Sequence, residues 1–187
     1  MQENPVITIG GPPGAGSTSI AHAVANEFEL RYFSTGKAFR KIAEERGISV
    51  KELSDTAEEG VDKQVDELTK EEARQGGVVM ESKLAAWITK EVEGCEAIRI
   101  WLEASVEARA QRVLNDEKER IAEAYETVED VQEQIRERWT EDKRRYREFY
   151  GYDLDDMSVY DLVIDTNELG LDEVKGRAIE FLREKLG

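Results

Sequence analysis

The sequence predicts an α/β fold in which a five-stranded parallel sheet carries helices on both faces. Short apolar runs alternate with helical stretches along all 187 residues, and this alternation favours a parallel sheet that is covered on both sides. The first apolar run also leads through a glycine-rich turn into a helix. Open sheets of this kind bind ligands beyond the carboxyl ends of their strands, so the turn marks the expected position of a site.

The expected strands are short and mostly apolar, as strands buried on both faces require. In chain order they are Val6–Gly10, Arg31–Ser34, Val78–Glu81, Ile98–Glu103 and Leu162–Asp165. The stretches between and after them place apolar residues at helical spacing. The expected helices are Ser17–Phe28, Thr35–Arg46, Val50–Glu59, Val61–Gln75, Val106–Asp116, Val128–Tyr150 and Leu171–Leu186.

No Pro-, Gly- or Ser-rich linker divides the chain, so residues 1–187 are expected to form a single domain. Two helix-rich insertions stand out, at about residues 35–75 and 121–150. We expect both to be mobile segments that close over the site.

The composition is strongly acidic, with a formal net charge of −16, which argues against general nucleic-acid binding because a phosphate backbone would be repelled. No apolar run is long enough to span a bilayer, and the N-terminus lacks the apolar segment of a signal peptide. The single Cys95 and the single His22 are too few for a zinc site. One cysteine also fits a reducing compartment, so we expect a cytoplasmic protein.

The segment from Gly11 to Ser19 has the spacing of a phosphate-binding loop, G-x-x-x-x-G-K-[ST], with Gly11 and Gly16 at the glycine positions. Its glycines let successive N–H groups turn inward on an anion, and the helix that follows adds the positive end of its dipole. Ser17 stands at the lysine position, so the loop lacks a cation. The alternative is a glycine-rich turn without a ligand. The residues expected to bind nucleotide phosphates are Gly11, Pro12, Pro13, Gly14, Ala15, Gly16, Ser17, Thr18 and Ser19.

Thr18 and Glu81 are the expected oxygen ligands of Mg²⁺. The Thr18 hydroxyl would bind an ion that bridges two phosphates, and Glu81, at the carboxyl end of its strand, would hold the ion or its waters. Lys83 follows two residues later and could contact a nucleotide phosphate or base. The alternative is a surface ion pair between Glu81 and Lys83.

Further candidates follow the second strand, where Thr35 can cap a helix and Arg40 falls one turn later. The Arg40 guanidinium could fork onto a second phosphate. The alternative is an ordinary helix cap followed by a solvated arginine.

The long helix carries an unusual number of basic residues for so acidic a chain. Arg138, Asp142 and Arg145 are spaced to share one helix face, and this face borders an apolar stripe. We expect Arg138 and Arg145 to fold over a pocket while the stripe packs, with several of the other basic residues solvated. Arg112, on the helix after the fourth strand, is a further candidate. The apolar stripe consists of Val128, Val131, Ile135, Trp139 and Tyr146.

Together these segments resemble the archaeal type of cytidylate kinase, within the nucleoside monophosphate kinase family of P-loop kinases. The resemblance spans nearly the whole chain and is most specific over Tyr146–Asp156 and Ser158–Thr166, where members read much like "YGxDxDDxSxYDLVIxT". It implies a five-stranded parallel sheet, a monophosphate-binding insertion at about residues 35–75 and a lid at about residues 121–150. The implied reaction transfers the γ-phosphate of ATP to CMP or dCMP, with Mg²⁺ as cofactor.

On this interpretation the acceptor phosphate is held by Thr35, Lys37, Arg40 and Lys83, and Arg138, Arg145 and Arg112 act on the transferring group. Small nucleotides are the expected partners, with no nucleic acid and no membrane, and the expected state is a monomer. The alternatives are an adenylate or broad-specificity monophosphate kinase and a catalytically weak nucleotide-binding regulator.

Three residues depart from the family pattern. Ser17 replaces the loop lysine, Lys37 stands where archaeal members often have Asp, and Lys83 stands where they usually have Arg. Because one lysine is lost and another is gained, we predict that Lys37 supplies the charge that Ser17 does not.

Overall fold

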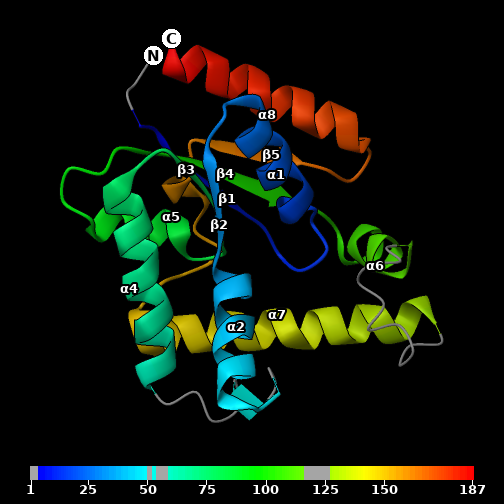
Figure 1. Ribbon diagram of the computed structural model, residues 1–187. Coiled ribbons are helices and arrows are strands. Elements are labelled where there is room, and N and C mark those ends of the chain that lie inside the picture. Colours follow the sequence, from blue (N-terminus) through cyan, green and yellow to red (C-terminus); the bar gives the residue numbers. More distant parts are fainter. Residues whose placement is uncertain (1–3, 50–51, 54–58, 116–126) are drawn as a thin grey trace.

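The computed structural model describes residues 4–49, 52–53, 59–115 and 127–187. Its centre is a five-stranded sheet with the strand order β2-β3-β1-β4-β5 (Figure 1). All four strand pairings are parallel, so the predicted α/β fold is confirmed. The strands match the expected ranges except that β4 begins one residue earlier. They are β1 (Val6–Gly10), β2 (Arg31–Ser34), β3 (Val78–Glu81), β4 (Ala97–Glu103) and β5 (Leu162–Asp165).

The helices also follow the expected order, with small differences at their ends. The expected helix Val50–Glu59 lies largely outside the described residues, as does the start of the expected lid, residues 121–126. The long helices are α1 (Ser17–Glu27), α2 (Thr35–Arg46), α4 (Glu59–Gln75), α6 (Val106–Asn115), α7 (Val128–Tyr150) and α8 (Leu171–Leu186). Three short elements were not expected: α5 (Ala85–Ile88) and the 3₁₀ turns η1 (Thr89–Glu91) and η2 (Met157–Val159).

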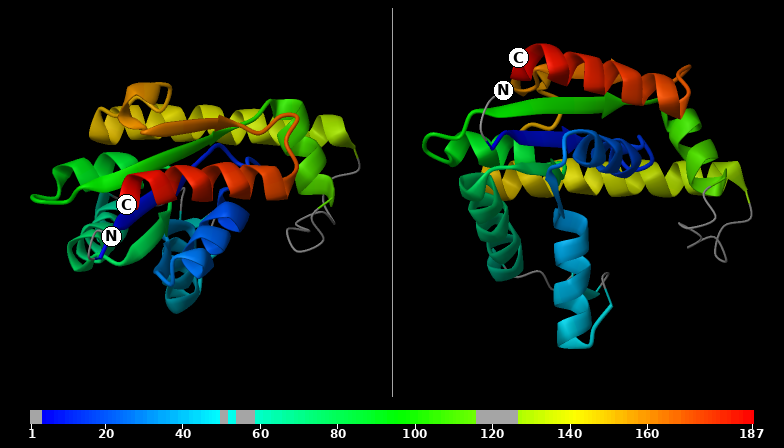
Figure 2. Two further views of the ribbon diagram at one scale, coloured as in Figure 1. Left: turned by 90° about the horizontal axis from the view of Figure 1, so that it is seen from above. Right: turned by 45° about the horizontal axis from the view of Figure 1, so that its top comes forward.

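Helices cover both faces of the sheet. Figure 2 shows α1 and α8 on one side of the strands and α7 on the other. On the first side, Val24 of α1 and Leu182 of α8 are fully buried in the cluster that holds Ile7 and Ile9 of β1. Burial on both faces explains why the central strands are continuous apolar runs.

On the other side, Met80 of β3 packs with Ala85 of α5. The long helix α7 reaches across this side and packs on α6 through Val131 and Ile135. Further along α7, Trp139 and Tyr146 join a second cluster with α5. The apolar stripe therefore packs as predicted, which fixes the direction in which the opposite residues of α7 face.

Helices α2 and α4 form a layer of their own, which extends away from the sheet in Figure 1. Ile42 and Ala43 of α2 and Val61 and Val65 of α4 share a buried cluster. This layer corresponds to the expected insertion at about residues 35–75, and it begins at the carboxyl end of β2.

The sheet register brings three functional segments to one edge. Glu81 of β3 lies opposite Ile9 of β1 and opposite Ser34 of β2. The glycine-rich loop follows β1, and α2 follows β2, so both begin beside Glu81. This edge is where an open parallel sheet binds its ligands.

Candidate active site

The loop between β1 and α1 is a tight turn whose backbone conformation depends on glycine. Gly14 and Gly16 have positive φ values of 83° and 97°, a region that strongly favours glycine. The N–H of Ala15 donates to the carbonyl of Pro12 at 3.0 Å. A Cβ at Gly14 would come within 3.0 Å of the Arg109 backbone, so both conformation and space require glycine there.

A buried arginine braces the loop from the other side. The Arg109 side chain donates from Nε to the carbonyl of Ala104 at 3.1 Å and from Nη1 to the carbonyl of Pro13 at 3.3 Å. Burial lowers the pKa of this guanidinium. Arg109 was not assigned a role from the sequence, although its position between Ala108 and Ala110 is a signal of an arginine on a packed helix face.

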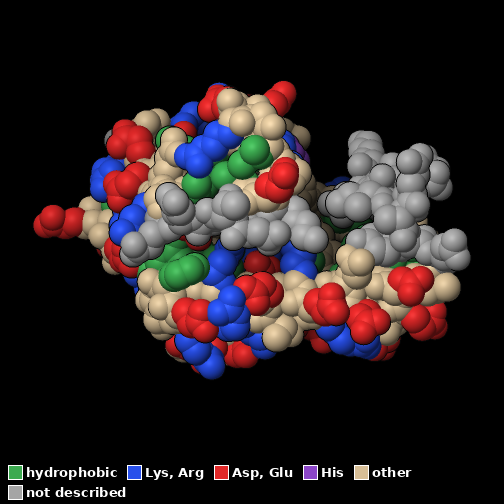
Figure 3. Space-filling view, turned by 90° about the horizontal axis from the view of Figure 1, so that it is seen from below, with side chains coloured by type: hydrophobic (Ala, Val, Ile, Leu, Met, Phe, Trp, Pro, Cys, Tyr) green, Lys and Arg blue, Asp and Glu red, His purple; other side chains and the backbone are tan. Residues whose placement is uncertain are grey.

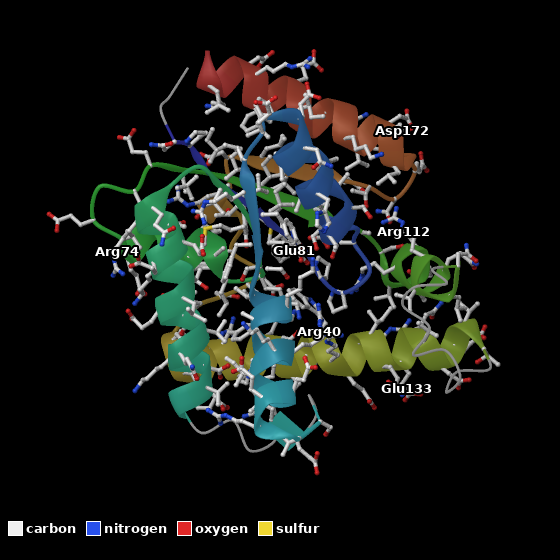
Figure 4. The ribbon with its side chains drawn as sticks, viewed as in Figure 1. Arg40, Arg74, Glu81, Arg112, Glu133 and Asp172 are labelled. Atoms are coloured by element: carbon white, nitrogen blue, oxygen red, sulfur yellow. The ribbon has the colours of Figure 1, made fainter. Side chains whose placement is uncertain are left out.

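The Glu81 carboxylate accepts hydrogen bonds from three hydroxyl groups. Its Oε1 accepts from Thr18 at 3.0 Å and from Ser17 at 3.4 Å, and its Oε2 accepts from Tyr32 at 2.7 Å. Figure 4 places Glu81 between the strand ends and α2. The structure thus brings the predicted pair Thr18 and Glu81 together, and Lys83 pairs with a different carboxylate.

Tyr32 was treated only as a strand residue in the sequence, and the structure gives it several partners. Burial, and then the hydrogen bond to Glu81, raise the pKa of its hydroxyl, so it stays protonated and acts as a donor. The His22 ring stacks on the tyrosine with a centroid distance of 3.9 Å. The Lys37 ammonium lies 4.6 Å from the centre of the tyrosine ring.

The start of α2 corrects one detail of the sequence interpretation. Ser34, rather than Thr35, is the N-cap, and its Oγ accepts from the N–H of Lys37 at 3.3 Å. The helix begins at Thr35, so the residue before it takes the capping position. Arg40 is exposed one turn later, and in Figure 4 it lies between α2 and α7.

Lys83 lies in a group of charges between α5 and α7. Its ammonium pairs with Asp142, and the two side chains are only 19% and 14% exposed. Burial lowers the pKa of Lys83, Asp142 opposes this effect, and the nearby charges of Arg138 and Arg145 lower the pKa further. The charges of Arg138 and Arg145, two of the predicted cations of α7, therefore act on Lys83.

Arg112 has different neighbours. Its Nη1 donates to Thr166 Oγ1 at 2.9 Å, and its Nη2 donates to the carbonyl of the same residue. Thr166 follows β5 directly, so these hydrogen bonds hold Arg112 at the carboxyl end of β5. In Figure 4 Arg112 lies at α6, the helix to which it belongs. These contacts do not join it to the Lys83 group.

Two carboxylates of α4 were missed by the sequence analysis. Asp66 accepts from the Tyr150 hydroxyl at 2.6 Å, and burial and then the charge of Asp62 raise its pKa. Asp62 Oδ2 is buried without a hydrogen-bond partner among the described residues. Asp62 also acts electrostatically on Arg145. The only signal in the sequence was the spacing of two aspartates one turn apart, each directly after a valine.

The chain matches a known protein family over most of its length, including the segments that form this site. Residues 6–168 match the model of the cytidylate kinase-like family. The chain belongs to this family. A cytidylate kinase from Methanopyrus kandleri is 40% identical over 176 residues, which cover 90% of this chain and 88% of the relative. The cytidylate kinase of Methanocaldococcus jannaschii is 39% identical over 184 residues, which cover 96% of this chain and 99% of the relative.

Solved structures agree with the fold of this cytidylate kinase-like protein. An uncharacterised protein from Eubacterium ventriosum superposes with a TM-score of 0.70 at 13% identity, covering 96% of this chain and 98% of that one. The shikimate kinase of Bacteroides thetaiotaomicron gives a TM-score of 0.66 at 15% identity, covering 97% of this chain and 98% of that one. At such low identity these structures support the P-loop kinase fold alone.

The donor atoms of the site in this family member suit Mg²⁺ together with a nucleotide. Thr18 and Glu81 present adjacent oxygens, and Mg²⁺ is usually bound by one or two such ligands plus substrate phosphates. Within the described part of the chain, no three His, Cys, Asp or Glu side chains form a metal cluster.

The described helices also include none that is long and apolar enough to cross a membrane. Figure 3 shows the molecule from below, where Lys and Arg side chains lie recessed among acidic side chains.

Proposed function

We propose that this member of the cytidylate kinase-like family transfers the γ-phosphoryl group of ATP to CMP or dCMP, giving CDP or dCDP. One observation supports the proposal most: the glycine-rich loop bonds through Thr18 to Glu81 at the carboxyl end of β3, and a group of cations surrounds Lys83, two residues further on. The names of relatives that align over most of the chain support the same activity.

The loop backbone from Gly11 to Ser19 would bind the donor phosphates, since its N–H groups and the dipole of α1 favour an anion. Thr18 and Glu81 would hold Mg²⁺, whose charge helps to neutralise the phosphates when it is bound. The hydrogen bond between Thr18 and Glu81 supports this assignment because it places both oxygens within reach of one ion.

The acceptor phosphate would be held by Thr35, Lys37, Arg40 and Lys83. Arg40 lies between α2 and α7 in Figure 4, and Lys83 pairs with Asp142 of α7. The neighbourhood of α7 that both cations share supports their assignment to one acceptor phosphate. A lysine offers a single point charge where an arginine would fork onto two oxygens. We therefore expect Arg40 to contribute more to orientation than Lys83.

Arg138 and Arg145 would act on the transferring phosphoryl group after closure, with Arg112 as a further candidate. Their proximity to Lys83 supports this role for the first two. A dedicated general base is not required, because the acceptor is an anionic phosphate and the reaction depends on positioning and charge neutralisation.

Asp62 supports a preference for cytosine. A carboxylate oxygen that is buried without a donor suits an amino group, which cytosine carries at the position where uracil has a carbonyl oxygen. Its electrostatic effect on Arg145, a residue proposed to act on the transferring group, supports a position near the acceptor nucleotide. We propose that Asp62 accepts a hydrogen bond from the cytosine amino group.

We further propose that residues 1–187 act as one domain, with residues 35–75 as the monophosphate-binding insertion and residues 121–150 as the lid. We also propose that the protein is a monomer and that it works in the cytoplasm.

The direct experiment incubates the protein with MgATP and CMP and separates the nucleotides. We expect ADP and CDP to form in equal amounts, and excess EDTA to abolish both. Formation of ADP without CDP would contradict phosphoryl transfer to CMP. Binding of ATP without turnover of any monophosphate would support the regulator alternative.

A further inference from the structure

Tyr32 is in contact with both halves of the proposed site. Its hydroxyl donates to Glu81 Oε2 at 2.7 Å, and the other Glu81 oxygen accepts from Thr18 of the loop. Its ring lies 4.6 Å from the ammonium of Lys37, which belongs to the acceptor-side helix α2. One side chain thus connects the phosphate loop to a cation on the facing element.

Glu81 accepts hydrogen bonds at both of its carboxylate oxygens, and none of them comes from Lys37. Tyr32 occupies one carboxylate oxygen, and Thr18 and Ser17 occupy the other. No carboxylate is paired with Lys37 in the part of the chain that the structure describes. The ammonium is held by the π-face of a ring, so its full charge stays available to a phosphate.

The ring itself is fixed by its other contacts. The His22 ring stacks on it at 3.9 Å with an interplanar angle of 23°. The hydroxyl bond to Glu81 anchors the far end of the same side chain. A ring held at both places restricts where Lys37 can rest, which lowers the entropy lost when the ammonium is used.

We propose that Tyr32 is a positioning residue that holds the Lys37 ammonium beside the phosphate loop, where it supplies the charge that Ser17 does not. This inference rests on the proposed function, because it needs a nucleotide phosphate in the loop. The inference adds Tyr32 of β2 to the residues of the proposed site. It also explains how Lys37 could be held where it replaces the charge of the missing loop lysine.

The test is a double-mutant cycle that separates the ring from the hydroxyl. Tyr32→Phe keeps the ring and loses the bond to Glu81, whereas Tyr32→Leu loses both, and Tyr32→Met is a second variant without a ring. An exposed cation–π contact corresponds to about a two- to five-fold effect. We expect kcat/KM with CMP to fall by about that factor from Tyr32→Phe to Tyr32→Leu, and from Tyr32→Phe to Tyr32→Met.

The decisive comparison repeats these variants in a Lys37→Met background, where the ring has no cation to hold. There the Phe, Leu and Met variants should have equal kcat/KM. A difference that persists without Lys37 would overturn the inference, because the ring would then act only on packing. Lys41→Met is the matched control, since Lys41 lies on the same helix and its ion pair, with Glu45, is exposed.

The same cycle is measured on the Kd of ATP in the presence of Mg²⁺. If wild-type protein does not turn over CMP but the ring and Lys37 remain coupled in ATP binding, the proposed function fails and the inference stands. If CMP is turned over and neither measurement shows coupling, the inference is wrong and the proposed function stands.

Discussion

At the scale of single residues, the site depends on side chains whose partners are distant in the sequence. Glu81 joins Thr18 of the loop and Tyr32 of the neighbouring strand. Arg109 supports the same loop through the carbonyl of Pro13. The bonds of Tyr32 to Glu81 and of Arg109 to Pro13 are partly buried, so leaving one of their polar atoms unpaired would cost free energy. The bond between Thr18 and Glu81 is exposed.

Replacing Asp62 of α4, whose Oδ2 has no hydrogen-bond partner among the described residues, should change base selection. In Asp62→Asn an amide replaces a pure acceptor and can turn its N–H₂ toward the carbonyl of uracil. We expect the ratio of kcat/KM for CMP to that for UMP to fall by about ten- to a hundred-fold. The matched control is Asp172→Asn, which changes an exposed aspartate at the start of α8. Equal ratios in wild type and Asp62→Asn would show that Asp62 does not contact the base.

The missing loop lysine gives a second prediction at this scale. If Lys37 supplies its charge, Lys37→Ala should lower kcat/KM at least about tenfold, and adding Ser17→Lys should restore part of the loss. Groups that share one role are strongly non-additive in such a cycle. Additive effects of the two substitutions would mean that the loop backbone, Mg²⁺ and the lid arginines provide the charge without Lys37.

The residues that could be predicted from the sequence are those whose role depends on local spacing. The loop from Gly11 to Ser19 is of this kind, because its glycines and its hydroxyl positions follow from neighbours in the chain. Tyr32 and Arg109 are not, since their hydrogen-bond partners lie 49 and 96 residues away. Their roles became visible only once the fold placed them at one edge of the sheet.

At the scale of elements, α7 links most parts of the proposed acceptor side. Its N-terminal half packs on α6 through Val131 and Ile135. Its C-terminal half presents Arg138, Asp142 and Arg145 around Lys83. The packed stripe fixes the rotation of the helix, so a displacement of α7 would move all of these charges together.

The arginines of α7 should contribute mainly in the transition state. Arg138→Ala and Arg145→Ala should each lower kcat, with a loss of about 2–4 kcal/mol of transition-state stabilisation, and should weaken ATP binding without acceptor much less. Arg144→Ala is the matched control, because Arg144 is exposed on the same helix and pairs with Glu141 and Glu148. A wild-type kcat in both test variants would mean that neither arginine acts on the transferring group.

The longer elements could be predicted from the sequence because hydrophobic periodicity extends over several residues in each. The three short elements could not: α5 spans four residues, and η1 and η2 span three each. Such lengths are too short for a periodic pattern. They depend on tertiary contacts, as in the burial of Ala85 and Ile88 beneath α4 and α7.

At the scale of the whole molecule, the strand order determines which segments meet. Because β3 lies between β1 and β2, its terminal Glu81 is next to both the loop and α2. The chain carries a formal net charge of −16, which repels anionic nucleotides at long range. The local group of Lys83, Arg138 and Arg145 opposes this repulsion where the phosphates are expected.

A substitution in the core on the α8 side should lower the stability of the protein without lowering kcat. Leu182 of α8 is fully buried against the sheet, on the face opposite α7. Leu182→Ala should destabilise the protein by about 2–5 kcal/mol, measured by denaturant unfolding. At low temperature the folded variant should keep the wild-type kcat. A large loss of kcat in the fully folded variant would show that the α8 face is coupled to the site.

The central claim is that this member of the cytidylate kinase-like family phosphorylates cytidine monophosphates. The most direct measurement is kcat/KM with MgATP for CMP, dCMP, UMP, AMP and GMP under one set of conditions. We expect CMP or dCMP to give the highest value and UMP, AMP and GMP all to be slower. An equal or higher value for AMP would contradict the substrate assignment while leaving the fold intact, and no turnover of any monophosphate would contradict the assignment as a kinase.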